Sequence, residues 1–122
     1  MDTSVSEKFL LSESLPKEQV AKGVFRQIHG YNKDIMLVRA YFDKDGIGAM
    51  HNHFHSQVTY VESGRFAVTI DGEEKILAAG DSFFIPPHED HGAVCLEEGT
   101  LVDVFSPVRE DFLRGEGLYN ED

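Results

Sequence analysis

One stretch restricts the fold of this chain more than any other: RFAVTIDGEEKILAA, residues 65–79. Every second residue from Phe66 to Ile70 is apolar, and alternate side chains on a β-strand share one face. Asp71-Gly72 then supplies the residue types of a two-residue hairpin turn, and the residues after it form the returning strand. The stretch therefore predicts a β-hairpin.

The β-type pattern continues along most of the chain. The other runs are VFRQIH (24–29), IMLVRAYF (35–42), DSFFI (81–85), HGAVCL (91–96) and LVDVF (101–105). They are rich in β-branched and aromatic residues, they are separated by turn residues such as Gly30 to Asp34, and no segment before Ser106 has a sustained 3.6-residue period. Many short strands at this spacing predict an all-β fold, either a sandwich or a closed barrel.

The length of 122 residues is that of one domain with one core. We expect residues 24–113 to form the barrel. Residues 1–23 are polar and weakly patterned, and they predict an N-terminal arm that pairs or packs at its ends. The C-terminal segment predicts a short helical turn, followed by a short acidic tail at residues 114–122.

The charge of the chain excludes two kinds of partner. Its 22 Asp and Glu residues against 11 Lys and Arg give a formal net charge of −11, which repels nucleic acid and anionic membranes. No apolar run approaches the ~20 residues that span a bilayer. An anionic substrate would need a local positive site within this negative protein.

The location of the protein is predicted from what the sequence lacks. The N-terminus has early acids, no basic region and a very short apolar run, so it does not predict a secretory signal. Cys95 is the only cysteine, which excludes an intrachain disulfide. We therefore expect a cytoplasmic protein.

The stretch HNHFHSQ, residues 51–57, carries candidate metal ligands. His51 and His53 share one face of a strand with Cα atoms ~7 Å apart, a workable separation for two imidazoles that meet one metal. On a straight strand Gln57 would lie ~20 Å from His51, too far for both to reach one ion. Either Gln57 is not a ligand or the chain bends after His53. Two histidines alone also fit a half-exposed polar strand.

A second motif raises the weight of the metal hypothesis. The stretch GDSFFIPPHEDHG, residues 80–92, joins a Gly-Asp turn, an apolar strand and a Pro-Pro break to His91. Here the chain resembles the cupin superfamily. One cupin motif is Gly, five residues, HxH, three or four residues, Glu, six residues, Gly; its HxH, its Glu position and its last Gly correspond to His51 and His53, Gln57 and Gly64.

The other cupin motif is Gly, five residues, PxG, two residues, His. It matches Gly80, Pro86 and His91, while His88 replaces its second Gly. The resemblance implies a double-stranded β-helix, a small jelly-roll barrel.

The resemblance also implies a set of metal ligands. It further implies that the chain bends between His53 and Gln57. The implied ligands are His51, His53, Gln57 and His91. The alternative is a cupin whose pocket has lost its metal. For His55 and His88 we prefer solvation in a loop or at the barrel rim over a role in supporting a ligand or contacting substrate.

Gln57 stands where many cupins have Glu, and this changes the expected chemistry. A glutamine coordinates through a neutral carbonyl oxygen, so three imidazoles and one amide leave a divalent ion its full charge. The set lacks the two-histidine-one-carboxylate arrangement of many oxygen-activating ferrous enzymes and favours Lewis-acid chemistry. The ligands fit several divalent ions, among them Ni, Zn, Mn and Fe.

The stretch LVDVFSPVREDFL, residues 101–113, adds a charged pair. Asp103 shares a strand face with Phe105, and an Asp among apolar residues is costly to bury unless it is paired or functional. An outward-facing Asp on an edge strand is the alternative. Arg109 could fold back over the barrel mouth as a carboxylate clamp, or could be a surface residue paired with Glu110 or Asp111.

Residues 24–113 as a whole resemble the pectin-degradation cupins that linearise 4,5-unsaturated uronates, a family that also has Gln at the position of Gln57. The resemblance implies ring opening of unsaturated monouronates from pectin or alginate to linear 4-deoxy-5-keto uronates. It implies that Asp103 is the acid/base, that Arg109 binds the carboxylate of the anionic sugar acid and contributes to catalysis, and that Phe105 lines the pocket. It also implies a homodimer, because small cupins commonly form dimers.

Two other classes of function remain open at this point. One is another metal enzyme, either a dioxygenase or an isomerase of a different sugar acid. The other is a non-catalytic cupin that binds a sugar acid; the Asp103 and Arg109 pair counts against it.

Overall fold

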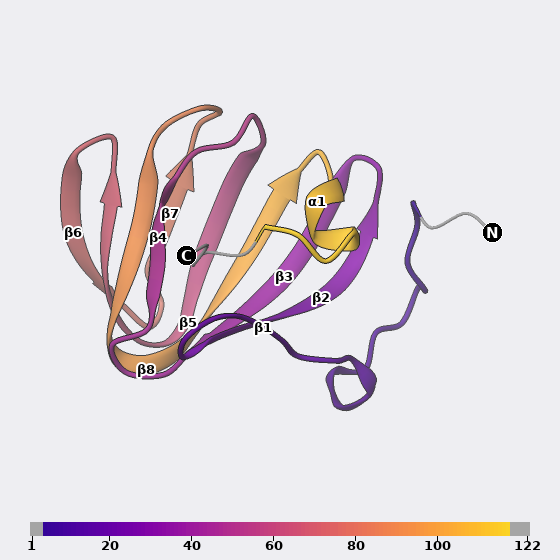
Figure 1. Cartoon of the computed structure of the whole chain (residues 1–122), viewed down its shortest axis with the longest axis horizontal. Coiled ribbons are helices and arrows are strands. Elements are labelled where there is room, and N and C mark those ends of the chain that lie inside the picture. Colours follow the sequence, from indigo (N-terminus) through magenta and orange to yellow (C-terminus); the bar gives the residue numbers. More distant parts are fainter. Residues whose placement is uncertain (1–3, 118–122) are drawn as a thin grey trace.

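A computed structural model of the chain describes residues 4–117 and confirms the predicted all-β class (Figure 1). In chain order the elements are the 3-10 helix η1 (Ser12–Ser14), the strands β1 (Glu18–Ala21), β2 (Val24–Asn32), β3 (Ile35–Phe42), β4 (Ile47–His51), β5 (Ser56–Ile70), β6 (Glu73–Ala78), β7 (Ser82–Ile85) and β8 (His91–Ser106), and the helix α1 (Glu110–Leu113). Within this part of the chain, no helix has the length and apolar character needed to cross a bilayer.

The strands form one antiparallel sheet that curls on itself (Figure 1). Its order is β1-β2-β3-β8-β5-β6, with β4 paired to β8 and β7 paired to β5. The long strands β5 and β8 pair along most of their length, from Ser56 opposite Ser106 to Ile70 opposite His91. Four of the shorter strands pair with these two: β3 and β4 with β8, and β6 and β7 with β5.

Three predicted strands are parts of two longer ones. Residues 91–96 and 101–105 both belong to β8, and residues 65–70 are the second half of β5. The interruption in the sequence pattern is a set of register shifts around Gly64 and Gly99, where the two backbones cross closely. A bulge bends a strand and increases its twist without ending the pairing.

The predicted turns are present. Asp71 and Gly72 both have positive φ, 50° and 83°, as a two-residue hairpin of this kind requires. The turn expected between residues 30 and 34 is shorter than predicted, because β2 continues to Asn32 and pairs there with Ile35.

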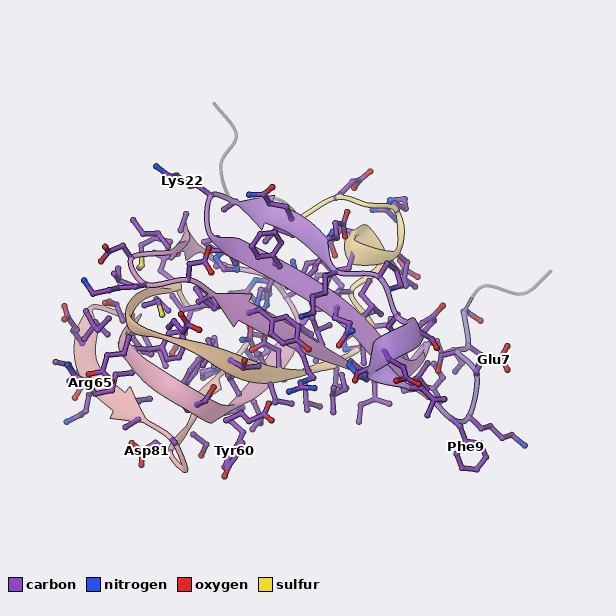
Figure 2. All side chains as sticks on the ribbon, turned by 90° about the horizontal axis from the view of Figure 1, so that it is seen from below. Glu7, Phe9, Lys22, Tyr60, Arg65 and Asp81 are labelled. Atoms are coloured by element: carbon purple, nitrogen blue, oxygen red, sulfur yellow. The ribbon has the colours of Figure 1, made fainter. Side chains whose placement is uncertain are left out.

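The N-terminal segment is fixed at several points. Residues 18–21 pair with β2 as β1, and the amide of Gln27 donates to the carbonyl oxygens of Ser12 (2.8 Å) and Leu15 (3.1 Å). Phe9 points away from the body of the molecule (Figure 2). The expected short helical turn is α1, which lies beside β2 and β3 (Figure 1). Residues 1–3 of the predicted arm and 118–122 of the predicted acidic tail lie outside the described residues.

The buried apolar residues form two clusters, and the second lies next to the polar site. The first cluster is centred on Phe42, Phe66 and Leu101. The second joins Phe105 of β8 to Phe112 of α1, whose rings meet edge to face at 5.6 Å.

The crossing of β5 and β8 yields a prediction about two glycines. Gly64 and Gly72 have nearly the same φ, 87° and 83°, yet a Cβ at Gly64 would lie 2.6 Å from the carbonyl oxygens of Glu97 and Glu98. Gly64→Ala should therefore lower the free energy of unfolding by about 2–4 kcal/mol, because both strain and backbone overlap act.

Gly72→Ala is the matched control. A Cβ there would meet nothing within 4 Å among the described residues, so only the strain of positive φ acts, about 1 kcal/mol. Urea unfolding measures both variants. Equal losses would contradict the close crossing at Gly64.

Candidate metal centre

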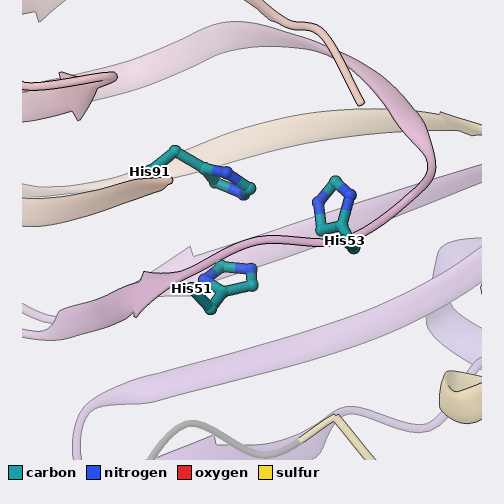
Figure 3. Close-up of side chains that lie close together, drawn as sticks. All are labelled: His51, His53 and His91. Carbon is teal, nitrogen blue, oxygen red and sulfur yellow. The ribbon is translucent and has the colours of Figure 1, made fainter. Parts of the chain in front are cut away.

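Three histidines from two parts of the chain lie close together in space (Figure 3). His51 is the last residue of β4, His53 follows two residues later, and His91 begins β8. One ring nitrogen from each lies within 4.8 Å of the others. His51 pairs with His91 across the β4–β8 ladder, so the strand register itself brings these two imidazoles together.

A backbone carbonyl orients each of the three rings. Nδ1 lies 2.8 Å from the Ala49 oxygen in His51, 3.1 Å from the His55 oxygen in His53, and 2.9 Å from the Glu89 oxygen in His91. Because a carbonyl oxygen only accepts hydrogen bonds, each Nδ1 carries the proton and each Nε2 presents a lone pair. Such support is typical of metal-binding histidines.

Gln57 joins the three histidines, as the bend predicted after His53 requires. β4 ends at His51 and β5 starts at Ser56, so the chain turns between them. The Gln57 side chain is buried, and its Oε1 lies 3.0 Å from His53 Nε2. Its Nε2 donates to Thr59 Oγ1 at 2.9 Å and, more weakly, to Asp103 Oδ1 at 3.4 Å. These two acceptors fix the orientation of the amide, with its oxygen toward the histidines.

The donor set fits a divalent cation. Oε1 of Gln57 and Nε2 of His53 are both acceptors, and they face each other, an arrangement that a shared cation would satisfy. Nε2 of His91 is buried and has no hydrogen-bond partner among the described residues. The three histidines can hold a metal ion, and the neutral nitrogen ligands suit several metals.

The surroundings keep these imidazoles neutral. Burial is the largest cause that lowers the pKa of His53 to about 4, and the Arg109 charge adds to it. Burial likewise lowers the pKa of His91 to about 4, against the carbonyl of Glu89, which raises it. At neutral pH both rings are therefore neutral, with the proton on Nδ1 and none on Nε2, the state in which an imidazole binds metal.

Asp103 points into the pocket, as its predicted strand face requires, and not outward from an edge strand. It lines the pocket together with His51, Gln57 and His91, and it accepts a hydrogen bond of 2.6 Å from the Thr59 hydroxyl. Burial raises the pKa of Asp103 to about 6, while the hydrogen bond from Thr59 and the charge of Arg109 lower it. At pH 7 the Asp103 carboxyl is therefore ionised in most molecules, so Asp103 can accept a proton.

Arg109 has features of both predicted alternatives, the carboxylate clamp and the arginine paired with a neighbouring acid. It pairs with Asp111, as a surface arginine would, but it is only 6% exposed and lines the same pocket. Its guanidinium lies 5.0 Å from the centre of the Phe105 ring. Phe105 is buried and also lines the pocket. A buried cation, already paired with Asp111, therefore lines the pocket.

The expectation for His55 is wrong, whereas the one for His88 agrees with its exposure. His55 is 6% exposed, its ring stacks on Phe54 at 4.0 Å, and its carbonyl orients His53. Its burial follows from the bend, which turns residue 55 inward. His88 is exposed, with φ of 71° at the position where the cupin motif has Gly. This is the left-handed region that a glycine adopts without strain.

Two residues of the site gave no clear signal in the sequence. Thr59 is fully buried and connects the amide of Gln57 to the carboxylate of Asp103. It lies two residues after Gln57 on one strand, so shared parity is the signal that could have found it. Asp111, which holds Arg109, was expected only as the partner of a surface arginine.

Comparisons with known proteins agree with this fold and site. The cupin domain family matches residues 38–105. The pectin degradation protein KdgF of Dickeya dadantii (strain 3937) is 42% identical over 108 residues, which are 87% of this chain and 98% of that protein. The chain therefore belongs to the cupin family, and it is a homologue of KdgF.

Two solved structures are similar over nearly the whole chain. An RmlC-like cupin from Shewanella frigidimarina NCIMB 400 is 51% identical with a TM-score of 0.88, covering 90% of this chain and 99% of that one. KdgF from Halomonas sp. is 37% identical with a TM-score of 0.83, covering 88% and 99%.

The Thr59 contacts yield a prediction about metal affinity. Thr59→Val keeps the shape of the side chain but removes the hydroxyl that holds the Gln57 amide. Loss of such a supporting contact typically weakens metal binding by about 10- to 100-fold. Competition for Zn²⁺ with a chromophoric chelator measures the change.

Thr59→Ser is the matched control, because it retains the hydroxyl. It should keep an affinity within about threefold of the parent, since it preserves both hydrogen bonds. If Thr59→Val binds Zn²⁺ as tightly as Thr59→Ser does, Thr59 does not orient the Gln57 amide.

Proposed function

We propose that this protein is a metal-dependent enzyme that opens the ring of 4,5-unsaturated monouronates and releases linear 4-deoxy-5-keto uronates. The observation that carries the proposal is one pocket, lined by His51, Gln57 and His91 of the neutral N3O metal-ligand set, that also holds a carboxylate and a buried arginine, with His53 in contact with Gln57. Support also comes from the homologue KdgF, which is named a pectin degradation protein. Pectin is a polymer of uronates. Lyases release unsaturated monouronates from it, and these monomers are anionic.

Four residues would hold the metal: His51, His53, His91 and Gln57. A divalent ion bound there supplies Lewis-acid polarisation of a substrate oxygen while keeping its full charge. The neutral imidazoles and the oriented amide are ready for it, since each presents a lone pair to the centre.

Arg109 binds the substrate carboxylate in a protein that otherwise repels anions. Its guanidinium offers paired N–H donors that match a carboxylate. Phe105 provides an apolar wall of the pocket close to the guanidinium. Together they orient the sugar ring toward Asp103.

Asp103 moves the proton. It removes the proton of the anomeric hydroxyl as the C1–O5 bond of the ring breaks, which leaves an aldehyde at C1 and an enolate at C5. Asp103 then returns this proton to C4, so that the C4–C5 double bond is lost and C5 becomes a ketone carbon. The sum is an isomerisation, and no atoms are gained or lost.

The function predicts a rate enhancement that depends on Asp103. Metal-loaded protein should accelerate the loss of the conjugated double bond of unsaturated galacturonate, followed by ultraviolet absorbance against a protein-free blank. Asp103→Asn should lower kcat by about 10²- to 10⁴-fold, the usual contribution of general acid-base catalysis, with metal retained.

Asp34→Asn, a change at an exposed carboxylate in the β2–β3 turn, is the control and should leave the rate unchanged. Absence of any acceleration by the parent protein would sink the proposed function. Full activity of metal-loaded Asp103→Asn would refute only the role of Asp103.

We also propose a cytoplasmic homodimer. The cytoplasmic location is supported by Cys95, which is a free thiol and fully buried. The dimer is supported by the outer face of the sheet, where the register aligns one apolar row across four strands: Leu37, Val104, Val58 and Phe84. Phe9 and Leu11 of the N-terminal segment are exposed as well, so one chain carries two apolar surfaces that a second copy would cover.

The dimer predicts different effects of two equally exposed residues. Phe84 in the apolar row and Ile76 on β6 are each 58% exposed. Phe84→Asp should yield a monomer by light scattering after gel filtration, because it places a charge in the interface. Ile76→Asp should leave a dimer. A dimer that survives Phe84→Asp, or a monomeric parent, would contradict the proposed interface.

A further inference from the structure

Arg109 is held by its neighbour Asp111 in a defined orientation. Nε of Arg109 donates to Asp111 Oδ1 at 3.1 Å, and Nη2 donates to Asp111 Oδ2 at 2.9 Å. The Arg109 side chain is almost completely buried, whereas Asp111 is about one quarter exposed, with 28% of its side-chain surface accessible. Burial would raise the pKa of Asp111, but the hydrogen bonds and the charge of Arg109 lower it, so Asp111 stays ionised at neutral pH.

The pairing leaves one side of the guanidinium available. An arginine has five N–H donors, and Asp111 takes two of them along the Nε–Nη2 edge. The remaining donors lie on Nη1 and on the other side of Nη2, and these two nitrogens can bind a second carboxylate with two parallel hydrogen bonds. Asp111 therefore orients the guanidinium without occupying the edge that a ligand would use.

Aromatic rings pack against the same guanidinium. It lies 4.0 Å from the centre of the Phe112 ring and 5.0 Å from that of Phe105. A second buried arginine, Arg26, lies 4.2 Å from the centre of the Phe112 ring and donates to the Glu116 carbonyl oxygen at 2.6 Å. Contacts of this kind favour a fixed planar arginine over a mobile one.

The backbone on both sides of Arg109 is also tied down. The Val108 amide donates to the Lys33 carbonyl oxygen in the β2–β3 turn at 3.2 Å, and Phe112 donates back to Arg109 at 3.0 Å. The barrel thus holds the segment that carries Arg109 on one side, and α1 holds it on the other. The backbone contacts fix the position of the segment, and Asp111 fixes the orientation of the Arg109 side chain.

We infer that Asp111 is a positioning residue: it holds Arg109 so that the Nη1–Nη2 edge meets the carboxylate of the sugar acid. The inference rests on the proposed function, because it assigns Arg109 to that carboxylate. Asp111 acts in binding and not in the proton transfer, so its loss should appear in KM and leave kcat nearly unchanged.

Asp111→Asn tests the inference, because it keeps the shape of the side chain and removes its charge. With unsaturated galacturonate, KM should rise about tenfold and kcat should stay within about twofold, the effect of one weakened charge-assisted pair. Glu110→Gln is the matched control on the same helix; Glu110 is exposed, and the change should alter neither constant.

Repeating the Asp111 substitution in a protein that already carries Arg109→Lys shows whether Asp111 acts through Arg109. In an Arg109→Lys protein, which lacks the planar guanidinium, Asp111→Asn should change KM by less than about twofold. An unchanged KM with lower kcat and a lower melting temperature would show that Asp111 serves only the fold. A lower KM would show that Asp111 competes with the ligand. Either result overturns the inference.

Calorimetry with galacturonate separates this inference from the proposed function. This sugar acid has the carboxylate but no double bond, so it can bind without reacting. If the parent protein shows no turnover, the proposed function fails, and weaker galacturonate binding by Asp111→Asn, by about tenfold, still supports the positioning role. Equal binding by both proteins, or no binding by the parent, overturns it.

Discussion

The antiparallel ladder between β5 and β8 is the constraint on which the site depends. Its register sets Gln57 opposite Phe105 and Thr59 opposite Asp103, and its far end sets Ile70 opposite His91. A ladder shifted by one residue would turn these side chains to the outer face, because neighbouring residues on a strand point in opposite directions. The register shifts near Gly64 bend the two strands enough for both ends of the ladder to close around one pocket.

Much of this arrangement could be predicted from the sequence, because alternation and turn residues act locally. The run from Ile35 to Phe42 has the predicted bounds, and the turn at Asp71-Gly72 has the predicted conformation. The convergence of His51, His53 and His91 depends on pairing between distant segments, and spacing alone did not supply it. The resemblance to a known fold supplied it, because it carries the register of strands that lie far apart in the sequence.

What the sequence did not reveal depends on tertiary contacts. His55 has the same parity as His53, yet only the bend after β4 decides whether its ring is buried or exposed. In the sequence, Arg109 and Asp111 are two residues apart, a spacing that predicts an ordinary surface ion pair. Its burial comes from Phe105 and Phe112, which lie beneath the guanidinium because α1 folds back onto the barrel.

The same contacts explain why residue 57 is a glutamine. The side chain offers an oxygen toward the histidines and N–H donors toward Thr59 and Asp103. A glutamate has no donor at neutral pH, so it would place a second carboxylate oxygen near 3.4 Å from Asp103 Oδ1, where like charges repel. The Thr59 hydroxyl has one proton and already gives it to Asp103. The amide is thus the side chain that can face a cation on one side and the carboxylate of Asp103 on the other.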